Sequence, residues 1–356
     1  MTKILITASG SPGFITVKKS LEKCENLQSG YVIHGCDINP SSIGLKLIDK
    51  TFTSPKGTSS NYIPCIYDYC VKNKIDLIIP CADEELLPLA KSKHIFEKIN
   101  CKILVSDENS LKICLDKSRL FDFLCDQGFQ KNIVDHDVCN DVESFLQSYE
   151  RLTNLGHRVC VKPSKTHGSR GFRVIKDQLC KEDFFNKKPN SSEITLQELV
   201  KILKSDGTNK FSDLLVMEFL PHDEYSVDCF SRDNEFICVP RTRKTISNGI
   251  CTSGKTIKKN DLIDLSESMY EKLGLKYNAN FQFRYDLSGV PKLLEVNPRF
   301  SGTMEHCRAS GVNFVEVAID NIMNFKQKKY NIRWGIEMQR VWTEIFQDEK
   351  DIFTLV

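Results

Sequence analysis

Short apolar runs alternate with polar, helix-like stretches over the first part of the chain. Each run has the length of one strand, and the runs are KILITA (3–8), YVIHGCDIN (31–39), IDLIIP (75–80) and CKILVS (101–106). Helical stretches follow these runs, and one of them begins at Asp83, whose carboxylate can cap the helix. Strands that alternate with helices predict a doubly wound parallel sheet, and therefore an α/β domain.

The pattern changes after residue 112. Residues 116–128 place apolar side chains at helical spacing and stop at Gly128. Strand-like runs then follow closely, with a strand, a glycine-bearing turn and a strand over 158–175, and a buried strand at 213–220. We therefore expect α+β organisation for the rest of the chain.

The stretch LLEVNPRFSG (293–302) carries a polar row where an ordinary strand ends. Because side chains alternate across a strand, Glu295, Asn297 and Arg299 share one face and Val296 points to the other. Carboxylate and amide oxygens are hard ligands of the kind that Mg²⁺ prefers. A solvated sheet face, on which Glu and Arg are ordinary, is the alternative interpretation.

The run 278–298 alternates on both sides of a turn, so it predicts a β-hairpin. We expect a two-residue turn at 288–289. Counting outward from that turn places Gln282 opposite Glu295, and directly opposed residues project to the same face. Away from the turn, one face of the hairpin is then core and the other is a polar cluster. Near the turn Arg284 and Lys292 break this segregation.

A second group of residues has the chemistry to bind an anion. Lys162 ends a predicted strand and is followed by a short loop of Gly168, Ser169, Arg170 and Gly171. Glycines let backbone N–H groups approach an anion, and lysine supplies a compact positive charge. The spacing is not that of a P-loop, and an ordinary hairpin turn is the alternative. Lys117, at a helix start, is either a further anion ligand or a solvated side chain.

The strand DLLVMEFL (213–220) leads into a proline and two acidic residues. A strand end beside a pocket can bind an adenine through its backbone, and a carboxylate such as Glu224 suits ribose hydroxyls. The alternative is a core strand that simply leaves its sheet.

Composition narrows the functional classes. The chain has 356 residues, 49 Lys+Arg against 47 Asp+Glu and a net charge of +2, so no broad charge favours nucleic acid or an anionic membrane. Its 15 cysteines include no C-x-x-C pair. The N-terminus lacks a signal-peptide pattern, and no apolar run reaches membrane-spanning length. We therefore expect a soluble, cytoplasmic protein whose cysteines are mostly buried and reduced.

A nicotinamide-dependent oxidoreductase is a rival interpretation of the N-terminal part. The first strand is followed by the glycine turn SGSPG, and the second strand ends near Asp37. The turn has G-x-x-G spacing instead of the G-x-G-x-x-G of dinucleotide-binding domains. This departure argues against the rival.

In order and spacing, these segments resemble the ATP-grasp superfamily, and in particular the carbamoyl phosphate synthetase large-subunit type of ATP-grasp domain. LLEVNPRFSG is the most specific piece of the resemblance. The family's architecture implies a preATP-grasp domain followed by a two-subdomain ATP-grasp fold. The implied boundaries are 1–112 for the preATP-grasp domain, 113–215 and 216–330 for the two subdomains, and 331–356 for a tail packed on the body.

The resemblance also implies a role for each matched residue. Lys117 and Lys162 would contact the phosphate groups of ATP, covered by the turn from Gly168 through Ser169 to Gly171. The adenine hinge would consist of Glu218, Phe219 and Leu220, and Glu224 would hold the ribose.

Two Mg²⁺ ions, for which Mn²⁺ is a possible substitute, are implied by the same resemblance. Gln282 and Glu295 would bind one ion, and Glu295 and Asn297 the other. Arg299 would face the transferred phosphoryl group, where a guanidinium can stabilise developing charge. The basic segment 241–256 would either cover phosphates or recognise an acidic substrate.

The implied chemistry is that of a carboxylate–amine ligase that works through an acyl phosphate and releases ADP and phosphate. Its partners would be small-molecule carboxylate and amine substrates, and a homodimer through the N-terminal domain is plausible. The chain is far shorter than a carbamoyl phosphate synthetase large subunit and has a single grasp unit, so we expect a stand-alone ligase. An ATP-grasp kinase and a non-catalytic nucleotide-binding regulator are the alternatives.

Overall fold

The computed structural model describes residues 1–27, 30–165, 170–178, 192–232, 235–247, 249–341, 346–347 and 352–353. The chain divides into two compact units. Unit 1 comprises Met1–Cys114, Glu224–Gln282 and Val296–Val356, and unit 2 comprises Leu115–Asp223 and Phe283–Glu295.

The N-terminal part of unit 1 is a five-stranded parallel sheet. Its strands are β1 (Thr2–Ile6), β2 (Tyr31–Asp37), β3 (Lys50–Thr53), β4 (Leu77–Ile79) and β5 (Lys102–Ile103), in the order β3-β2-β1-β4-β5. The apolar side chains of β1 and β4 are fully buried, as expected for a sheet covered on both faces. The predicted doubly wound parallel sheet is confirmed.

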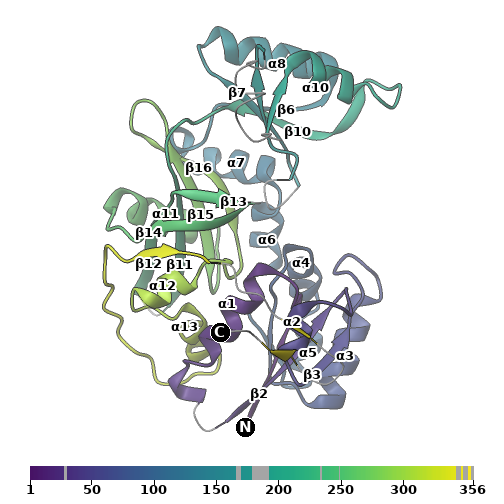
Figure 1. Cartoon of the computed structure of the whole chain (residues 1–356), viewed down its shortest axis with the longest axis vertical. Helices are drawn as coiled ribbons and strands as arrows, with labels where there is room; N and C mark the ends of the chain where they lie inside the picture. Colours follow the sequence, from purple (N-terminus) through teal and green to yellow (C-terminus); the bar gives the residue numbers. More distant parts are fainter. Residues whose placement is uncertain are drawn as a thin grey trace. The chain divides into compact units, whose positions relative to one another are not determined.

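Helices cover both faces of this sheet. They are α1 (Pro12–Leu21), α2 (Ile43–Lys46), α3 (Tyr62–Asn73), α4 (Asp83–Lys91), α5 (Lys93–Glu97) and α6 (Glu108–Cys114), with a 3₁₀ turn, η1 (Glu25–Leu27). Figure 1 shows α1 on one side of the sheet and α3 and α5 on the other. The first side contributes Phe14 and Val17 to a large buried core.

The side chains of Asp37 and Ser42 lie against the glycine turn that follows β1. The Gly10 amide donates to Asp37 Oδ2 at 2.6 Å, and the Asn39 amide donates to Asp37 Oδ1 at 2.9 Å. A Cβ atom at Gly10 would lie 2.4 Å from the Ser42 hydroxyl oxygen. The Asp37 carboxylate therefore binds the backbone amides of Gly10 and Asn39. A carboxylate that stabilises the fold in this way is a poor ligand for a dinucleotide ribose, which argues against the oxidoreductase interpretation.

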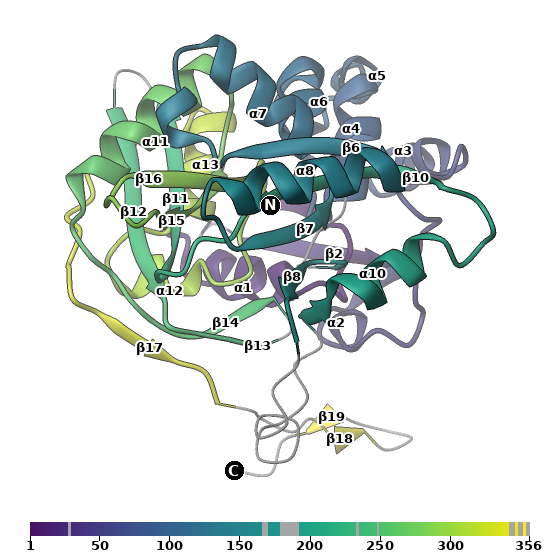
Figure 2. The same ribbon diagram turned by 90° about the horizontal axis from the view of Figure 1, so that it is seen from above.

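Unit 2 contains a second five-stranded sheet. Its strands are β6 (His136–Asp141), β7 (Val159–Pro163), β8 (Arg173–Lys176), β9 (Glu193–Thr195) and β10 (Lys210–Glu218), in the order β6-β10-β7-β8-β9. The helical elements are α7 (Lys117–Asp126), η2 (Gln130–Asn132), α8 (Val142–Asn154) and α10 (Leu196–Leu203). Figure 2 shows α8 lying along the face formed by β6, β10 and β7, where Phe145 and Leu152 pack against Val161 and Val216.

A four-stranded sheet has the order β12-β11-β15-β16. Its strands are β11 (Glu224–Arg232), β12 (Glu235–Arg243), β15 (Ala279–Tyr285) and β16 (Pro291–Asn297), and the unit boundary runs through the last two. The accompanying helices of unit 1 are α11 (Asn260–Lys272), α12 (Glu305–Ala309) and α13 (Phe314–Ile322). These mixed elements agree with the α+β organisation expected for the later part of the chain.

Two small sheets complete the described residues. One has the order β13-β14-β17, with strands β13 (Thr245–Ser247), β14 (Ile250–Lys255) and β17 (Glu337–Gln339). The other pairs β18 (Phe346–Gln347) with β19 (Ile352–Phe353). Among the helices within the described ranges, none combines the length and the apolarity needed to cross a lipid bilayer.

The turn between β15 and β16 differs from the predicted one. The Asp286 amide donates to the Val290 carbonyl at 3.0 Å, and the Gly289 amide donates to the Asp286 carbonyl at 3.1 Å. The loop therefore has three residues, 287–289, and the two-residue turn is wrong. The Asp286 carboxylate accepts from the amides of Ser288 and Val290, each at 2.9 Å, which stabilises the longer turn. The count that set Gln282 opposite Glu295 started from the shorter turn and therefore loses its basis. The shared metal role of these two residues, which the family resemblance implies, stays a prediction.

Candidate functional site

Three charged side chains of unit 2 converge at the end of β7. Lys162 Nζ lies 2.8 Å from Glu295 Oε2, and Lys117 Nζ lies 3.9 Å from the same oxygen. All three are largely shielded from water, with side-chain exposures of 11% for Lys162, 16% for Glu295 and 4% for Lys117. We call Lys117, Lys162 and Glu295 the lysine–glutamate cluster.

Local hydrogen bonds explain why Lys117 reaches this cluster. Asp116 caps α7 by accepting from the Ser118 amide at 3.2 Å, and the Lys117 amide donates to the Ser164 carbonyl at 3.2 Å. The Ser164 hydroxyl in turn donates to the Asp116 carboxylate. Because Ser164 follows directly on β7, these bonds hold the first turn of α7 against the strand that carries Lys162.

The predicted phosphate loop is described only in part. Gly168 and Ser169 lie outside the described residues. Gly171 has a φ of +74°, and a Cβ atom there would lie 2.7 Å from the Pro163 side chain. Only glycine fits this backbone conformation and this close approach without strain. The covering role of the loop stays a prediction.

The predicted adenine hinge is tied into unit 2 through its backbone. The Phe219 amide donates to the Arg158 carbonyl at 2.6 Å, and the Leu220 carbonyl accepts from Arg284 Nη1 at 2.9 Å. Glu218 Oε1 accepts from the Asp135 amide at 3.0 Å. These bonds hold the three hinge residues in one conformation at the end of β10.

Two arginines bracket the hinge phenyl ring. The guanidinium carbon of Arg158 lies 4.5 Å from the Phe219 ring centre, and that of Arg284 lies 5.9 Å from it. Such cation–π contacts stabilise an aromatic ring most strongly where water is excluded. Neither arginine is predicted as a site residue from the sequence, because neither belongs to a motif and their contact with Phe219 is tertiary.

Glu224 is paired with an arginine of the neighbouring strand. It begins β11, and the antiparallel register sets it opposite Arg243 of β12, whose Nη1 forms an ion pair with its carboxylate. Arg243 Nη2 also donates to the Gly249 carbonyl at 2.7 Å. The proposed ribose ligand is therefore charge-neutralised within unit 1, and its ribose contact stays a prediction.

The basic segment 241–256 is largely committed to internal ion pairs. Arg241 is 1% exposed and binds Asp228, the Thr303 hydroxyl and, at 2.9 Å, the Ser301 hydroxyl. Lys255 Nζ lies 3.1 Å from Glu337. Together with Arg243, these contacts give three of the segment's four predicted basic residues a carboxylate partner. Lys244, which is exposed, is the residue that best suits an external anion.

Arg299 is held by a carboxylate from the N-terminal domain of unit 1. Its Nε and Nη2 donate to the two oxygens of Asp83, each at 2.8 Å. Nη2 also lies 3.4 Å from Asn297 Oδ1, and Nη1 donates to the Phe300 carbonyl at 3.2 Å. The prediction that Asp83 caps α4 is wrong: Ala82 occupies the cap position, and the Asp83 carboxylate binds Arg299. A planar fork that meets a carboxylate at two points fixes the orientation of the guanidinium.

The oxygen donors present suit Mg²⁺. The predicted ligand Glu295 carries a carboxylate, and the predicted ligands Gln282 and Asn297 carry amide oxygens on the strands of the same hairpin. Within the described ranges there is no group of three His, Cys, Asp or Glu side chains that could hold a metal by themselves. This donor set therefore fits an ion that takes one or two protein carboxylates and completes its shell with phosphate oxygens and water.

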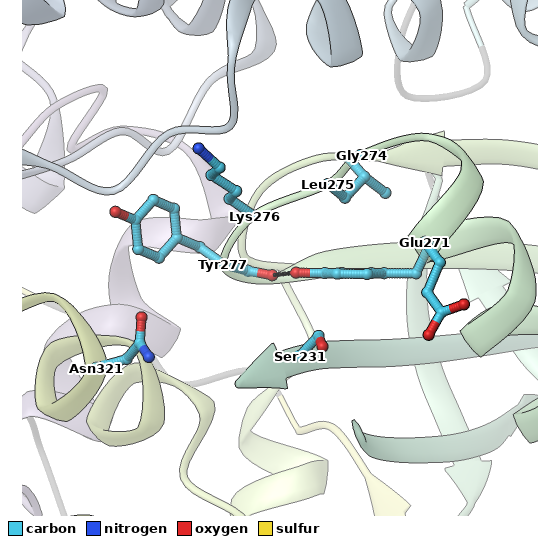
Figure 3. Close-up of a pocket in the computed structure, with 8 residues that line it drawn as sticks. Ser231, Glu271, Gly274, Leu275, Lys276, Tyr277 and Asn321 are labelled. Atoms are coloured by element: carbon cyan, nitrogen blue, oxygen red, sulfur yellow. Dashed lines mark hydrogen bonds between the residues drawn. The ribbon is translucent and has the colours of Figure 1, made fainter. Parts of the chain in front are cut away.

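A pocket elsewhere in unit 1 does not coincide with any predicted site residue. It has a volume of about 380 Å³ and is lined by Ser231, Tyr270, Glu271, residues 274–277 and Asn321. The Tyr270 hydroxyl donates to the Tyr277 carbonyl at 2.5 Å. Figure 3 shows Ser231, Glu271, Tyr277 and Asn321 among the side chains that line the pocket. The lining mixes positive, negative and neutral groups, so it favours no single class of ligand.

Two family models match this chain. Residues 210–344 match a model described as ATP-grasp in the biosynthetic pathway with Ter operon, and residues 4–104 match the PylC-like N-terminal domain. The chain therefore contains an ATP-grasp domain. The resemblance inferred from LLEVNPRFSG is confirmed, and the parallel sheet of unit 1 corresponds to the PylC-like N-terminal domain.

Proteins similar to this chain match it at low identity. The carbamoyl phosphate synthase large chain of Clostridium acetobutylicum is 25% identical over 310 residues, which are 82% of this chain and 26% of that protein. The chain thus spans about a quarter of the length of this curated relative. A solved ADP complex of N5-carboxyaminoimidazole ribonucleotide synthetase matches with a TM-score of 0.68 and 12% identity over 93% of this chain and 79% of that one. Biotin carboxylase from Campylobacter jejuni matches with a TM-score of 0.67 and 13% identity, over 93% and 73% of the two chains.

Proposed function

We propose that this chain is an ATP- and Mg²⁺-dependent carboxylate–amine ligase that forms an amide or peptide-like bond. The observation that supports the proposal is the lysine–glutamate cluster, in which two ammonium groups lie beside a carboxylate that we propose as a metal ligand. Two of the similar proteins, the N5-carboxyaminoimidazole ribonucleotide synthetase and the biotin carboxylase, were solved as an ADP complex and a beta-gamma-ATP complex, respectively. The names of these relatives support a nucleotide-dependent reaction of small molecules.

Each residue of the proposed ligase has a distinct task. Lys117 and Lys162 bind the phosphate groups, and the hinge Glu218 to Leu220 binds the adenine through its backbone. ATP supplies the phosphoryl group that turns the substrate carboxylate into an acyl phosphate, from which an amine displaces phosphate. Arg299 orients and stabilises the charge that develops on the phosphoryl group. Such a reaction requires positioning and electrostatic stabilisation, without a protein nucleophile.

Mg²⁺ is proposed to lie on the β15–β16 hairpin. Glu295 and Gln282 would hold one ion, and Glu295 and Asn297 a second. When bound, the metal neutralises the charge of the phosphate oxygens. Mn²⁺, with similar ligand preferences, is the natural substitute in an assay.

An ADP-release screen against pools of carboxylates and amines, followed by mass spectrometry of each hit, tests the proposal. We expect ADP, phosphate and a new amide from one pool, and loss of ADP release in Glu295→Ala. The exposed Lys210 on β10 offers a control, because Lys210→Ala removes a lysine of the same unit without touching the cluster. Full activity in Glu295→Ala would refute the metal assignment.

The products separate the two alternatives. An ATP-grasp kinase would give ADP with a phosphorylated acceptor and no amide. A non-catalytic regulator would bind nucleotide and release no ADP from any pool.

A further inference from the structure

In the lysine–glutamate cluster, the proposed metal ligand Glu295 lies beside Lys117 and Lys162, which are proposed to bind phosphate. Glu295 Oε2 has Lys162 Nζ at 2.8 Å and Lys117 Nζ at 3.9 Å. The three side chains sum to one net positive charge, and they are between 4% and 16% exposed. Two ammonium groups therefore stand where a divalent cation would have to approach this oxygen.

An ammonium and Mg²⁺ compete for the same lone pairs. Mg²⁺ binds oxygen at about 2.0–2.1 Å and tolerates little deviation from octahedral geometry. A lysine nitrogen 2.8 Å from Oε2 occupies one direction of approach to that oxygen. In a partly buried site, repulsion between the incoming cation and two ammonium groups is screened far less than in water.

Hydrogen bonds hold the backbone next to the two lysines. The bonds among Asp116, Lys117 and Ser164 hold the start of α7 against the end of β7. A lysine carries its charge on a flexible four-carbon stem with rotatable donors, so its head can exchange one oxygen partner for another. A triphosphate carries several negative charges, so it can draw both heads away from a single carboxylate.

We infer that Lys162, assisted by Lys117, gates the metal site: Glu295 takes up a divalent cation only when nucleotide phosphates have drawn the lysines away. Metal and nucleotide then bind with positive coupling, and the coupling acts equally in both directions. This inference rests on the proposed function for the identity of the nucleotide. Its metal component depends only on the contacts of the cluster.

Isothermal titration of MnCl₂ into the full chain without nucleotide tests the gate. We expect weak Mn²⁺ binding by the wild type and binding about tenfold tighter in Lys162→Met, which is within the usual range of coupling between sites. Lys165→Met is the matched control, because Lys165 is 66% exposed and pairs with Asp116 at 3.6 Å instead of with Glu295. It should bind Mn²⁺ as the wild type does.

The double variant Lys162→Met with Glu295→Gln identifies the metal ligand. It should lose the gain in affinity, since the released carboxylate is gone. If Lys162→Met fails to give a cooperative thermal transition, Lys162→Gln removes the charge while keeping a polar head, and the same tenfold gain is expected. Wild-type protein that binds Mn²⁺ without nucleotide as tightly as the charge-removing variant would overturn the gate.

A second titration gives the other half of the coupling. A non-hydrolysable ATP analogue should tighten Mn²⁺ binding to the wild type more than to Lys162→Met, because phosphate oxygens ligate the metal in both proteins and only the wild type also has this lysine to release. Absence of that effect overturns the coupling to nucleotide. Failure of the ligase proposal has a different signature: no ADP release from any substrate pool, with the nucleotide-free Mn²⁺ pattern of the variants unchanged.

Discussion

Arg299 and Asp83 form a pair in which one residue orients the other. Their two hydrogen bonds of 2.8 Å join the end of β16 to the start of α4 within unit 1. Asp83→Asn keeps the shape and removes the charge, so we expect the maximal rate of ADP release to fall about 10- to 100-fold, equivalent to losing one charged hydrogen bond of about 1.5–3 kcal/mol. The Michaelis constant for ATP should change little, because Asp83 has no proposed contact with the nucleotide.

The neighbouring carboxylate provides the control for Asp83. Glu84 is exposed on the same first turn of α4, so Glu84→Gln should keep the wild-type rate. Steady-state kinetics of the two variants with the substrate pool found in the screen make the comparison. A wild-type rate in Asp83→Asn would show that Arg299 needs no partner for its orientation.

Glu85, two residues after Asp83, should make the stability of the folded chain depend on pH. It is 5% exposed, accepts from the Thr7 hydroxyl at 2.6 Å, and burial raises its pKa from 4.5 to about 7. Between these two values the folded state holds a proton that the unfolded state has released. The free energy of unfolding therefore falls as the pH rises, by up to about 1.4 kcal/mol per pH unit for this group.

Urea denaturation at pH 5, 6 and 7 measures this contribution. Glu85→Gln should remove it, so the difference in stability between variant and wild type should shift in favour of the variant as the pH rises. Glu84→Gln, which changes an exposed carboxylate, should follow the wild type. Parallel pH profiles for wild type and Glu85→Gln would contradict the raised pKa.

At the scale of elements, one buried ion pair fastens three segments of unit 1 together. Arg241 of β12 binds Asp228 of β11 and the hydroxyls of Ser301 and Thr303, which follow Arg299 in the chain. Removing one partner leaves an uncompensated buried charge, so Arg241→Met should lower the free energy of unfolding by about 3–5 kcal/mol. Chemical denaturation measures the loss.

Two further variants make the test of this ion pair specific. Lys244→Met changes an exposed neighbour and should stay within about 0.5 kcal/mol of the wild type. Adding Asp228→Asn to Arg241→Met should restore part of the stability, since the orphaned charge is then removed. A loss below about 1 kcal/mol in Arg241→Met would contradict the structural role assigned to the pair.

At the scale of the whole molecule, nucleotide and metal together should stabilise the chain. A ligand that binds only the folded state contributes about 2.7 kcal/mol at a concentration 100 times its dissociation constant. We therefore expect Mg²⁺ with a non-hydrolysable ATP analogue to raise the unfolding temperature by several degrees, and Glu295→Ala to lose most of that rise. Thermal unfolding with each ligand alone and with both makes the measurement. No shift at millimolar concentrations would argue against nucleotide binding.

The features of this chain that could be predicted from its sequence are those that depend on local periodicity and on the order of motifs. Alternating strand and helix periods led to the parallel sheet of unit 1, because burial on both faces requires continuous apolar strands. The order of the lysines, the hinge strand and LLEVNPRFSG led to the ATP-grasp domain. The turn at 287–289 was mispredicted because the Asp286 carboxylate organises the loop, a side-chain effect that alternation alone does not report.

The amino-acid sequence by itself determined which residue types stand at the end of each strand, and therefore the candidate ligands. Only the tertiary structure decided which charges meet. Lys162 and Glu295 are 133 positions apart, and Arg299 and Asp83 are 216 apart. The periodicity of a strand or a helix fixes the direction of a side chain relative to its neighbours in the same element, whereas an ion pair across such separations depends on how sheets and helices pack. That packing set Lys162 against Glu295 and Arg299 against Asp83.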